Sequence, residues 1–451
     1  MIKLNEFQIK TWNSFFIMLF LNTIHLKIKA QMQYIIKFTI LLITLLLLGC
    51  NNTNTTKTSA TNDSIKKFLE IAKNDTVDFK IRDKYNQKAF NLLDLSKNDS
   101  VLRNNLNKIT RYSSKTENFK DYKKFSKLFI EKSLISNDTV NIARFYRYKA
   151  GFLRKNNVYD SSFYYFLKSE KYYKSTTNYL ELSRLYLYTA ILLVKIDDNI
   201  GADYYNTKSK LYYDKQNKKD LSHEYNILNE KGYILHNLKN FNLAIFYHNQ
   251  ALKIAKSNKL IGYNNTSLIG TSYNNIGIAY NGKKQFKKAI YYFKEGLKKI
   301  NILKNDPELN GLLLSNLGLS ILQTKDNKSA IIYLNKAEII LNNCDFYSES
   351  AQNSIYKSDY YFKLKDTLNA KLFADKALII ARKSKSPYTI LNSLVQVGYV
   401  NKEKASKSIK EYDSKIDSLI DKERITRNQF YNIQLQTNEI TKEKETAIKQ
   451  K

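Results

Sequence analysis

Apolar residues recur along most of the chain at the three- and four-residue spacing of amphipathic helices, and Gly, Ala or Ser return at fixed places among them. Aligned on these small residues, the segment 143–385 divides into six units whose starts are 40, 42, 45, 41 and 40 residues apart. The units begin near Ala143, Ser183, Tyr225, Gly270, Gly311 and Ala351. Because each unit has room for two helices, the pattern predicts a stack of antiparallel helix pairs.

Three positions of the unit hold a small residue in all six copies. The eighth position holds Ala150, Ala190, Gly232, Gly277, Gly318 and Ser358. The twentieth position holds Ser162, Ala202, Ala244, Ala289, Ala330 and Ala370, and the twenty-seventh holds Ser169, Ser209, Ala251, Gly296, Ala337 and Ala377. Small side chains let helices approach closely. We therefore expect the eighth and twentieth positions to meet within a unit, and the twenty-seventh to meet the first helix of the next unit.

Adjacent bulky residues also recur in the second half of each unit. They are Tyr164-Tyr165, Tyr204-Tyr205, Phe246-Tyr247, Tyr291-Tyr292, Ile332-Tyr333 and Leu372-Phe373. We interpret this column as core rather than as an aromatic binding site, since large apolar side chains at helical spacing usually fill the interior.

The composition points to an all-α protein. The 451 residues include only 12 Gly and 2 Pro, too few for most β-sandwiches, barrels and Gly-rich nucleotide folds. Two Cys exclude a disulfide-framed scaffold. The net charge of +33 is spread along the chain without an arginine-rich arm, so we expect solvated helix faces and no nucleic-acid partner.

The unit resembles the tetratricopeptide repeat (TPR). Its fullest match is Tyr273, Ile276, Gly277 and Tyr280 in the first half, followed by Phe286, Ala289, Phe293 and Gly296. The units are longer than the roughly 34 residues of the standard repeat. The resemblance implies a right-handed α-solenoid of antiparallel helix pairs over residues 64–400, with clear repeats at 143–385.

The resemblance also implies a concave groove, lined by the first helix of each unit, in which a protein or peptide binds. The residues that it places there are Arg144, Arg147, Arg154, Asn229, Tyr233, His236, Asn274 and Asn281. Amides can donate to and accept from a peptide main chain, and the arginines could hold an acidic group. The alternative is that these are ordinary exposed residues.

The amino terminus predicts export and lipid anchoring. Residues 38–48 form an apolar run too short to span a bilayer but of the length of a signal-peptide core, and the run ends at Gly49-Cys50. This resembles a bacterial lipobox, which implies an acylated Cys50 and a place in the cell envelope, most simply on the periplasmic side of a membrane. We interpret 1–31 as a misassigned upstream leader, 32–50 as the signal peptide and 51–63 as a flexible tether.

Residues 401–451 interrupt the repeat. Ile409, Tyr412, Ile416, Leu419, Phe430, Ile433 and Ile440 follow alternating three- and four-residue steps, which predicts one long helix. We expect its first half to cap the solenoid and its second half to project as a stalk or to self-associate through 402–451. The segment resembles the part of envelope TPR sensors that precedes a histidine kinase or helix-turn-helix module, so a sensory half of a signalling protein is the alternative to a scaffold.

The chain shows no pattern of catalytic residues. Nucleotide-binding loops, the Gly-x-Ser-x-Gly elbow and the His-Glu-x-x-His zinc motif are absent from the sequence. His223, His236 and His248 are too widely spaced to place two metal ligands on adjacent helical turns. We therefore expect neither an enzyme, a metal nor a cofactor.

Overall fold

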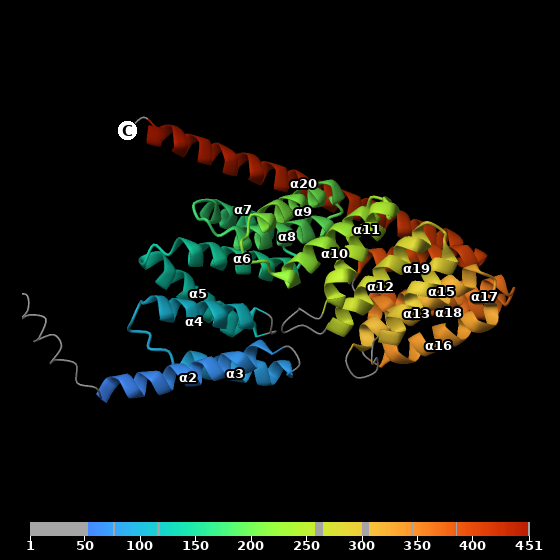
Figure 1. The fold of residues 1–451 in the computed structure, drawn as a ribbon. Coiled ribbons are helices and arrows are strands. Elements are labelled where there is room, and N and C mark those ends of the chain that lie inside the picture. The colour runs from blue at the N-terminus through green and yellow to red at the C-terminus, as the bar shows by residue number, and fades with distance from the viewer. Residues whose placement is uncertain are drawn as a thin grey trace, which may run out of the picture. The chain divides into compact units, whose positions relative to one another are not determined.

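A computed structural model describes residues 53–74, 77–114, 118–257, 265–299, 306–343, 346–384 and 386–449. Over these residues the regular elements are all α-helices, which confirms the all-α prediction (Figure 1). The chain divides into two units after Ser96. The export signal and Cys50 lie outside the described residues. Within those residues, no helix is both long and apolar enough to cross a membrane.

The first unit contains helices α2 (Thr53–Lys73) and α3 (Phe79–Asn91), which pack on each other. Phe68 and Tyr85 face across them, with ring centroids 5.6 Å apart. The segment 51–63, expected as a flexible tether, is helical from Thr53 onward. A helix that is already anchored by buried Ile65 and Leu69 extends at little cost into a neighbouring segment without Gly or Pro, because propagation needs no new nucleus.

The second unit begins with α4 (Ser100–Ser113) and α5 (Phe119–Ile135) and continues as helix pairs. The pairs are α6 (Thr139–Lys155) with α7 (Tyr159–Lys174), α8 (Tyr179–Lys195) with α9 (Asn199–Asp214), α10 (Leu221–Asn237) with α11 (Phe241–Lys256), α12 (Asn265–Gly282) with α13 (Phe286–Lys299), α15 (Pro307–Gln323) with α16 (Asn327–Asn342), and α17 (Tyr347–Lys363) with α18 (Thr367–Ser384). Helices α19 (Pro387–Val400) and α20 (Lys402–Lys449) complete the chain.

The structure buries all eighteen small residues of the three columns. Where a column holds Ser, the hydroxyl donates to a backbone carbonyl of the facing helix: Ser162 Oγ to Ala150 O and Ser169 Oγ to Ala143 O, both at 2.8 Å. Where the column holds Gly, a large side chain lies against it. The ring of Phe293 covers Gly277, and Leu334 covers Gly318. The helices of a pair therefore touch almost at the backbone.

The turns inside the pairs use residues other than Gly. Asn157, Asp197, Lys239, Lys284, Lys325 and Lys365 all have positive φ, between 55° and 69°, at the same place in successive repeats. The next helix is commonly capped by Asp or Asn, as where the Asp198 side chain accepts from the Gly201 amide at 2.8 Å. This turn geometry explains how so many helices connect in a chain with so few Gly.

The column of bulky pairs is only half core. The first member of each pair is exposed, with accessible fractions from 43% for Tyr164 to 59% for Leu372. The second member points inward, and Tyr205, for example, is buried. Adjacent residues on a helix lie about 100° apart, so both cannot face the same interior. The expectation that the whole column is core was therefore wrong for Tyr164, Tyr204, Phe246, Tyr291, Ile332 and Leu372.

Helix α20 packs on α19 and, further along, on α7 (Figure 1). The predicted single long helix is present, but its second half is not a free stalk at Phe430, which is 4% exposed and lies in the hydrophobic cluster of α6 to α9. Tyr412, Ile416, Leu419 and Ile433 are half-buried on the same side of the helix. These five residues of the apolar seam thus face the chain's own repeats, whereas Ile409 of the same seam is 56% exposed.

Candidate functional site

The first helices of the early repeats form a basic pocket. A cavity of about 190 Å³ opens between α4, α6 and α8. Its lining consists of Arg111, Ser114, Arg147, Tyr148, Gly151, Phe152, Arg154, Lys155 and Tyr188. Four cations and three aromatic rings thus surround a space large enough for one acidic group.

Arg147 is a fixed wall of this pocket. Its guanidinium pairs with Glu181 at 2.7 Å and lies 4.8 and 5.6 Å from the ring centroids of Tyr148 and Tyr188. Burial would raise the pKa of Glu181, but Arg147, Arg184 and Arg144 outweigh it and lower that pKa to about 2. Glu181 is therefore ionised at neutral pH and neutralises part of the arginine cluster.

Arg154 is the half-buried cation of the pocket that forms no ion pair with the described residues, whereas Arg111 and Lys155 are exposed at its rim. Its Nε is buried and has no hydrogen-bond partner among the residues that the structure describes. Because the guanidinium is partly removed from solvent, burial lowers the pKa of Arg154. Burial also raises the pKa of Glu230 to about 7, against the opposing effects of Arg154 and Lys195. An anion entering the pocket would relieve this uncompensated positive charge.

The predicted asparagines lie further along the first helices and bridge neighbouring repeats. Asn229 Oδ1 accepts from Asn275 Nδ2, and Asn274 Oδ1 accepts from Asn316 Nδ2, both at 3.0 Å. Asn281 Oδ1 accepts from the Ser320 hydroxyl at 3.0 Å. Their carbonyl oxygens are thus engaged in holding the repeats in register.

The other predicted groove residues differ in accessibility. Tyr233 is 46% exposed, whereas Arg144 is half-buried and donates to Asn141 Oδ1 at 3.0 Å. His236 is half-buried against the ring of Phe241, 5.2 Å away, and burial lowers its pKa. Of the eight predicted residues, the pocket itself brings together Arg147 and Arg154.

Sequence reasoning missed Arg111, Tyr148, Tyr188 and Glu230. Tyr148, Tyr188 and Glu230 all occupy the sixth position of their repeats. This position follows the fifth, which supplied Arg147, Asn229 and Asn274, so the same alignment could have identified it. Arg111 lies in α4, where the small columns are missing and no repeat register could be assigned.

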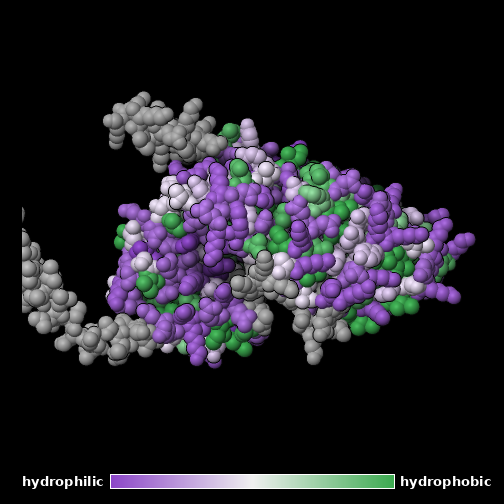
Figure 2. Space-filling model, in the orientation of Figure 1, coloured by the Kyte–Doolittle hydropathy of each residue, from purple (hydrophilic) through white to green (hydrophobic). Residues whose placement is uncertain are grey.

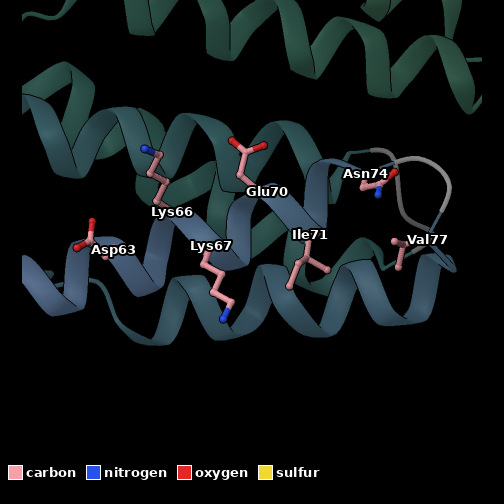
Figure 3. A pocket seen from close by; sticks show the side chains of 7 residues that line it. All are labelled: Asp63, Lys66, Lys67, Glu70, Ile71, Asn74 and Val77. Atoms are coloured by element: carbon pink, nitrogen blue, oxygen red, sulfur yellow. The ribbon is translucent and has the colours of Figure 1, made fainter. Parts of the chain in front are cut away.

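A second hollow, of about 490 Å³, lies along α2 in the first unit (Figure 3). Lys66 and Glu70 extend to one side of the helix and Lys67 to the other, so its polar groups do not converge. The face of the molecule in Figure 2 is mostly hydrophilic, with hydrophobic patches between the hydrophilic residues. Within the described residues, no group of three or more His, Cys, Asp or Glu side chains is placed to hold a metal.

A family model of the tetratricopeptide repeat matches residues 225–258, in α10 and α11. The chain contains a tetratricopeptide repeat. No curated protein sequence matches the chain.

Solved structures share the TPR-like fold over most of the chain. The apo form of the quorum sensor NprR from B. thuringiensis is 14% identical with a TM-score of 0.52, and the match covers 81% of this chain and 98% of NprR. The Rap conjugation gene regulator of plasmid pLS20, solved with its Phr* peptide, is 13% identical with a TM-score of 0.51, over 81% and 97% of the two chains. Aspartyl phosphate phosphatase F from Bacillus subtilis is 15% identical with a TM-score of 0.51, over 82% and 94%. At these identities the likeness shows the fold.

Proposed function

We propose that this TPR-like solenoid is a noncatalytic scaffold that binds an acidic protein segment or peptide along its first helices, with an acidic group of the ligand in the Arg154 pocket. The observation that carries the proposal is that Arg147 and Arg154, which both line the pocket, differ in whether a carboxylate neutralises them. Both arginines have a buried Nε without a hydrogen-bond partner, but Arg147 pairs with Glu181 at 2.7 Å, whereas Arg154 forms no ion pair with any carboxylate of the described residues. The solved Rap regulator that contains its Phr* peptide supports the proposal by showing that a solenoid of this fold can hold a peptide.

Removing the charge of Arg154 tests the proposal. The probe is a fluorescein-labelled hexaglutamate peptide with a free C-terminal carboxylate, titrated by fluorescence anisotropy against the full chain. Hydrogen bonds to charged groups contribute about 1.5–3 kcal/mol, so Arg154→Gln should weaken binding roughly tenfold or more.

Lys171→Gln is the matched control. Lys171 is an exposed residue of α7 and does not line the pocket, yet its substitution removes the same unit of charge. It should change the affinity less than twofold. Equal weakening by both variants would mean that the peptide responds only to net charge, and the proposed site would be wrong.

The anchoring part of the proposal concerns Cys50. We propose that Cys50 is acylated and holds the scaffold on a membrane of the bacterial cell envelope. The support is the apolar run at 38–48, which ends immediately before Gly49-Cys50. Two buried acyl chains are enough for stable anchoring.

A further inference from the structure

Helix α20 connects the end of the repeat array to its beginning. Near its start, Lys404 pairs with Asp375 of α18 at 2.7 Å. Near its middle, Glu423 accepts a hydrogen bond from the Tyr388 hydroxyl at the start of α19. The helix then reaches α7, the second helix of the first clear repeat (Figure 1).

One aromatic ring is the most buried part of the contact with α7, and Ile433 packs against the same hydrophobic cluster. Phe430 stacks on Phe163 with ring centroids 4.2 Å apart and planes inclined by 1°. Its neighbour Tyr431 is 62% exposed on the other side of α20. A single buried ring in an otherwise largely exposed half-helix makes a docking point that can be occupied or vacated as a unit.

One hydrophobic cluster connects this docking point to the basic pocket. Tyr188 lines the pocket and also packs against the hydrophobic cluster that contains Phe430. Tyr148 lines the pocket too and lies beneath the same Arg147 guanidinium, but it is not part of that cluster. Tyr159, which also packs against the cluster, interacts electrostatically with Arg154.

We propose that docking of α20 at Phe163 and occupancy of the Arg154 pocket are positively coupled through Tyr188. With Phe430 in place, the cluster against which Tyr188 packs is complete and the pocket keeps its shape. When Phe430 leaves, the cluster loses one of its buried rings, and Tyr188, which packs against that cluster, is held less firmly in the pocket wall. Because coupling is reciprocal, a ligand in the pocket holds α20 down by the same factor. The nature of the ligand rests on the proposed function, whereas the coupling between Tyr188 and Phe430 does not.

The first test needs no ligand. Amide hydrogen exchange is followed in residues 423–433 of the full chain. Phe430→Ala should accelerate exchange there at least tenfold, and Tyr188→Ala should do so at least threefold. The matched controls are Tyr431→Ala and Tyr148→Ala, which should leave the exchange of this segment within twofold of wild type. Unchanged exchange in α10 and α11 shows that each variant remains folded. If Phe430→Ala does not remain folded, Phe430→Leu provides a milder variant.

Either of two results would overturn the coupling. One is wild-type exchange in Phe430→Ala, which would mean that the ring does not hold α20. The other is equal exchange in Tyr188→Ala and Tyr148→Ala.

The second test uses the hexaglutamate probe. Saturating peptide should slow exchange in 423–433 in the wild type, and Phe430→Ala should weaken peptide binding at least threefold while Tyr431→Ala does not. Peptide that binds the wild type without slowing this exchange would refute the coupling. If the peptide does not bind the wild type at all, the proposed function fails, and the exchange experiment without ligand still decides whether pocket wall and helix are linked.

Discussion

The close packing of α12 against α13 gives a sharp prediction at Gly277. A Cβ added there would lie 2.5 Å from Cε1, 2.7 Å from Cζ and 2.8 Å from Cδ1 of Phe293. Those distances are well inside van der Waals contact, and Phe293 is fully buried. The substitution Gly277→Ala therefore forces the ring or one of the two helices to move.

The size of the effect follows from two opposing contributions. Overpacking a well-packed core costs about 1–3 kcal/mol. In the opposite direction, Ala in place of Gly in a helix interior stabilises the folded state by about 0.5–1 kcal/mol. We expect Gly277→Ala to lower the free energy of unfolding by about 1–2 kcal/mol, and Gly277→Leu, which adds three more carbons at the same point, by several kcal/mol.

Gly151→Ala is the matched control, since a Cβ there meets nothing within 4 Å. Only the propensity contribution remains, so this variant should be about 0.5–1 kcal/mol more stable than wild type. Urea denaturation followed by circular dichroism at 222 nm compares the three proteins. A Gly277→Ala protein as stable as Gly151→Ala would refute the close approach of α12 and α13 at this column.

Three further outcomes can be checked. Glu181→Gln should destabilise the protein by about 3–5 kcal/mol in urea denaturation, because it leaves Arg147 buried without its counter-charge. The folded pKa of Glu181 is lowered from 4.5 to about 2, so the stability that its ion pair contributes is complete above pH 4.5 and disappears as the pH falls through 2. Glu230 behaves in the opposite sense, because burial raises its folded pKa from 4.5 to about 7: the wild type should lose stability as the pH rises through 7, and Glu230→Gln should remove that slope, so an unchanged slope would contradict its burial. Cys50→Ala should move the protein from the membrane to the soluble fraction on ultracentrifugation of cell lysates, and continued membrane retention would exclude acylation as the anchor.

The repeat could be predicted because its signal is local and recurrent. Gly277 and Ala289 meet their partners within one helix pair, and the same small residues return in every unit, so the register did not depend on any distant contact. The prediction was wrong for the exposed ring of Tyr164 because the recurring bulky pairs indicate only that these residues lie on the second helix of each unit. They do not indicate which of the two adjacent side chains faces inward. The pocket was half predicted: Arg147 and Arg154 came from the repeat position, whereas Arg111 comes from a helix without repeat signal.

Helical periodicity and the recurrence of small residues by themselves determined that this chain forms paired, closely packed helices, because both are properties of short segments. Only the tertiary structure decided which charged residues form ion pairs and against which helices the last helix packs. Arg147 and Glu181 lie in different repeats and pair only after the helices stack. Phe430 finds Phe163 across most of the chain, and that choice depends on the path of the whole array, because an apolar seam on a helix specifies that it will be buried but not against which partner.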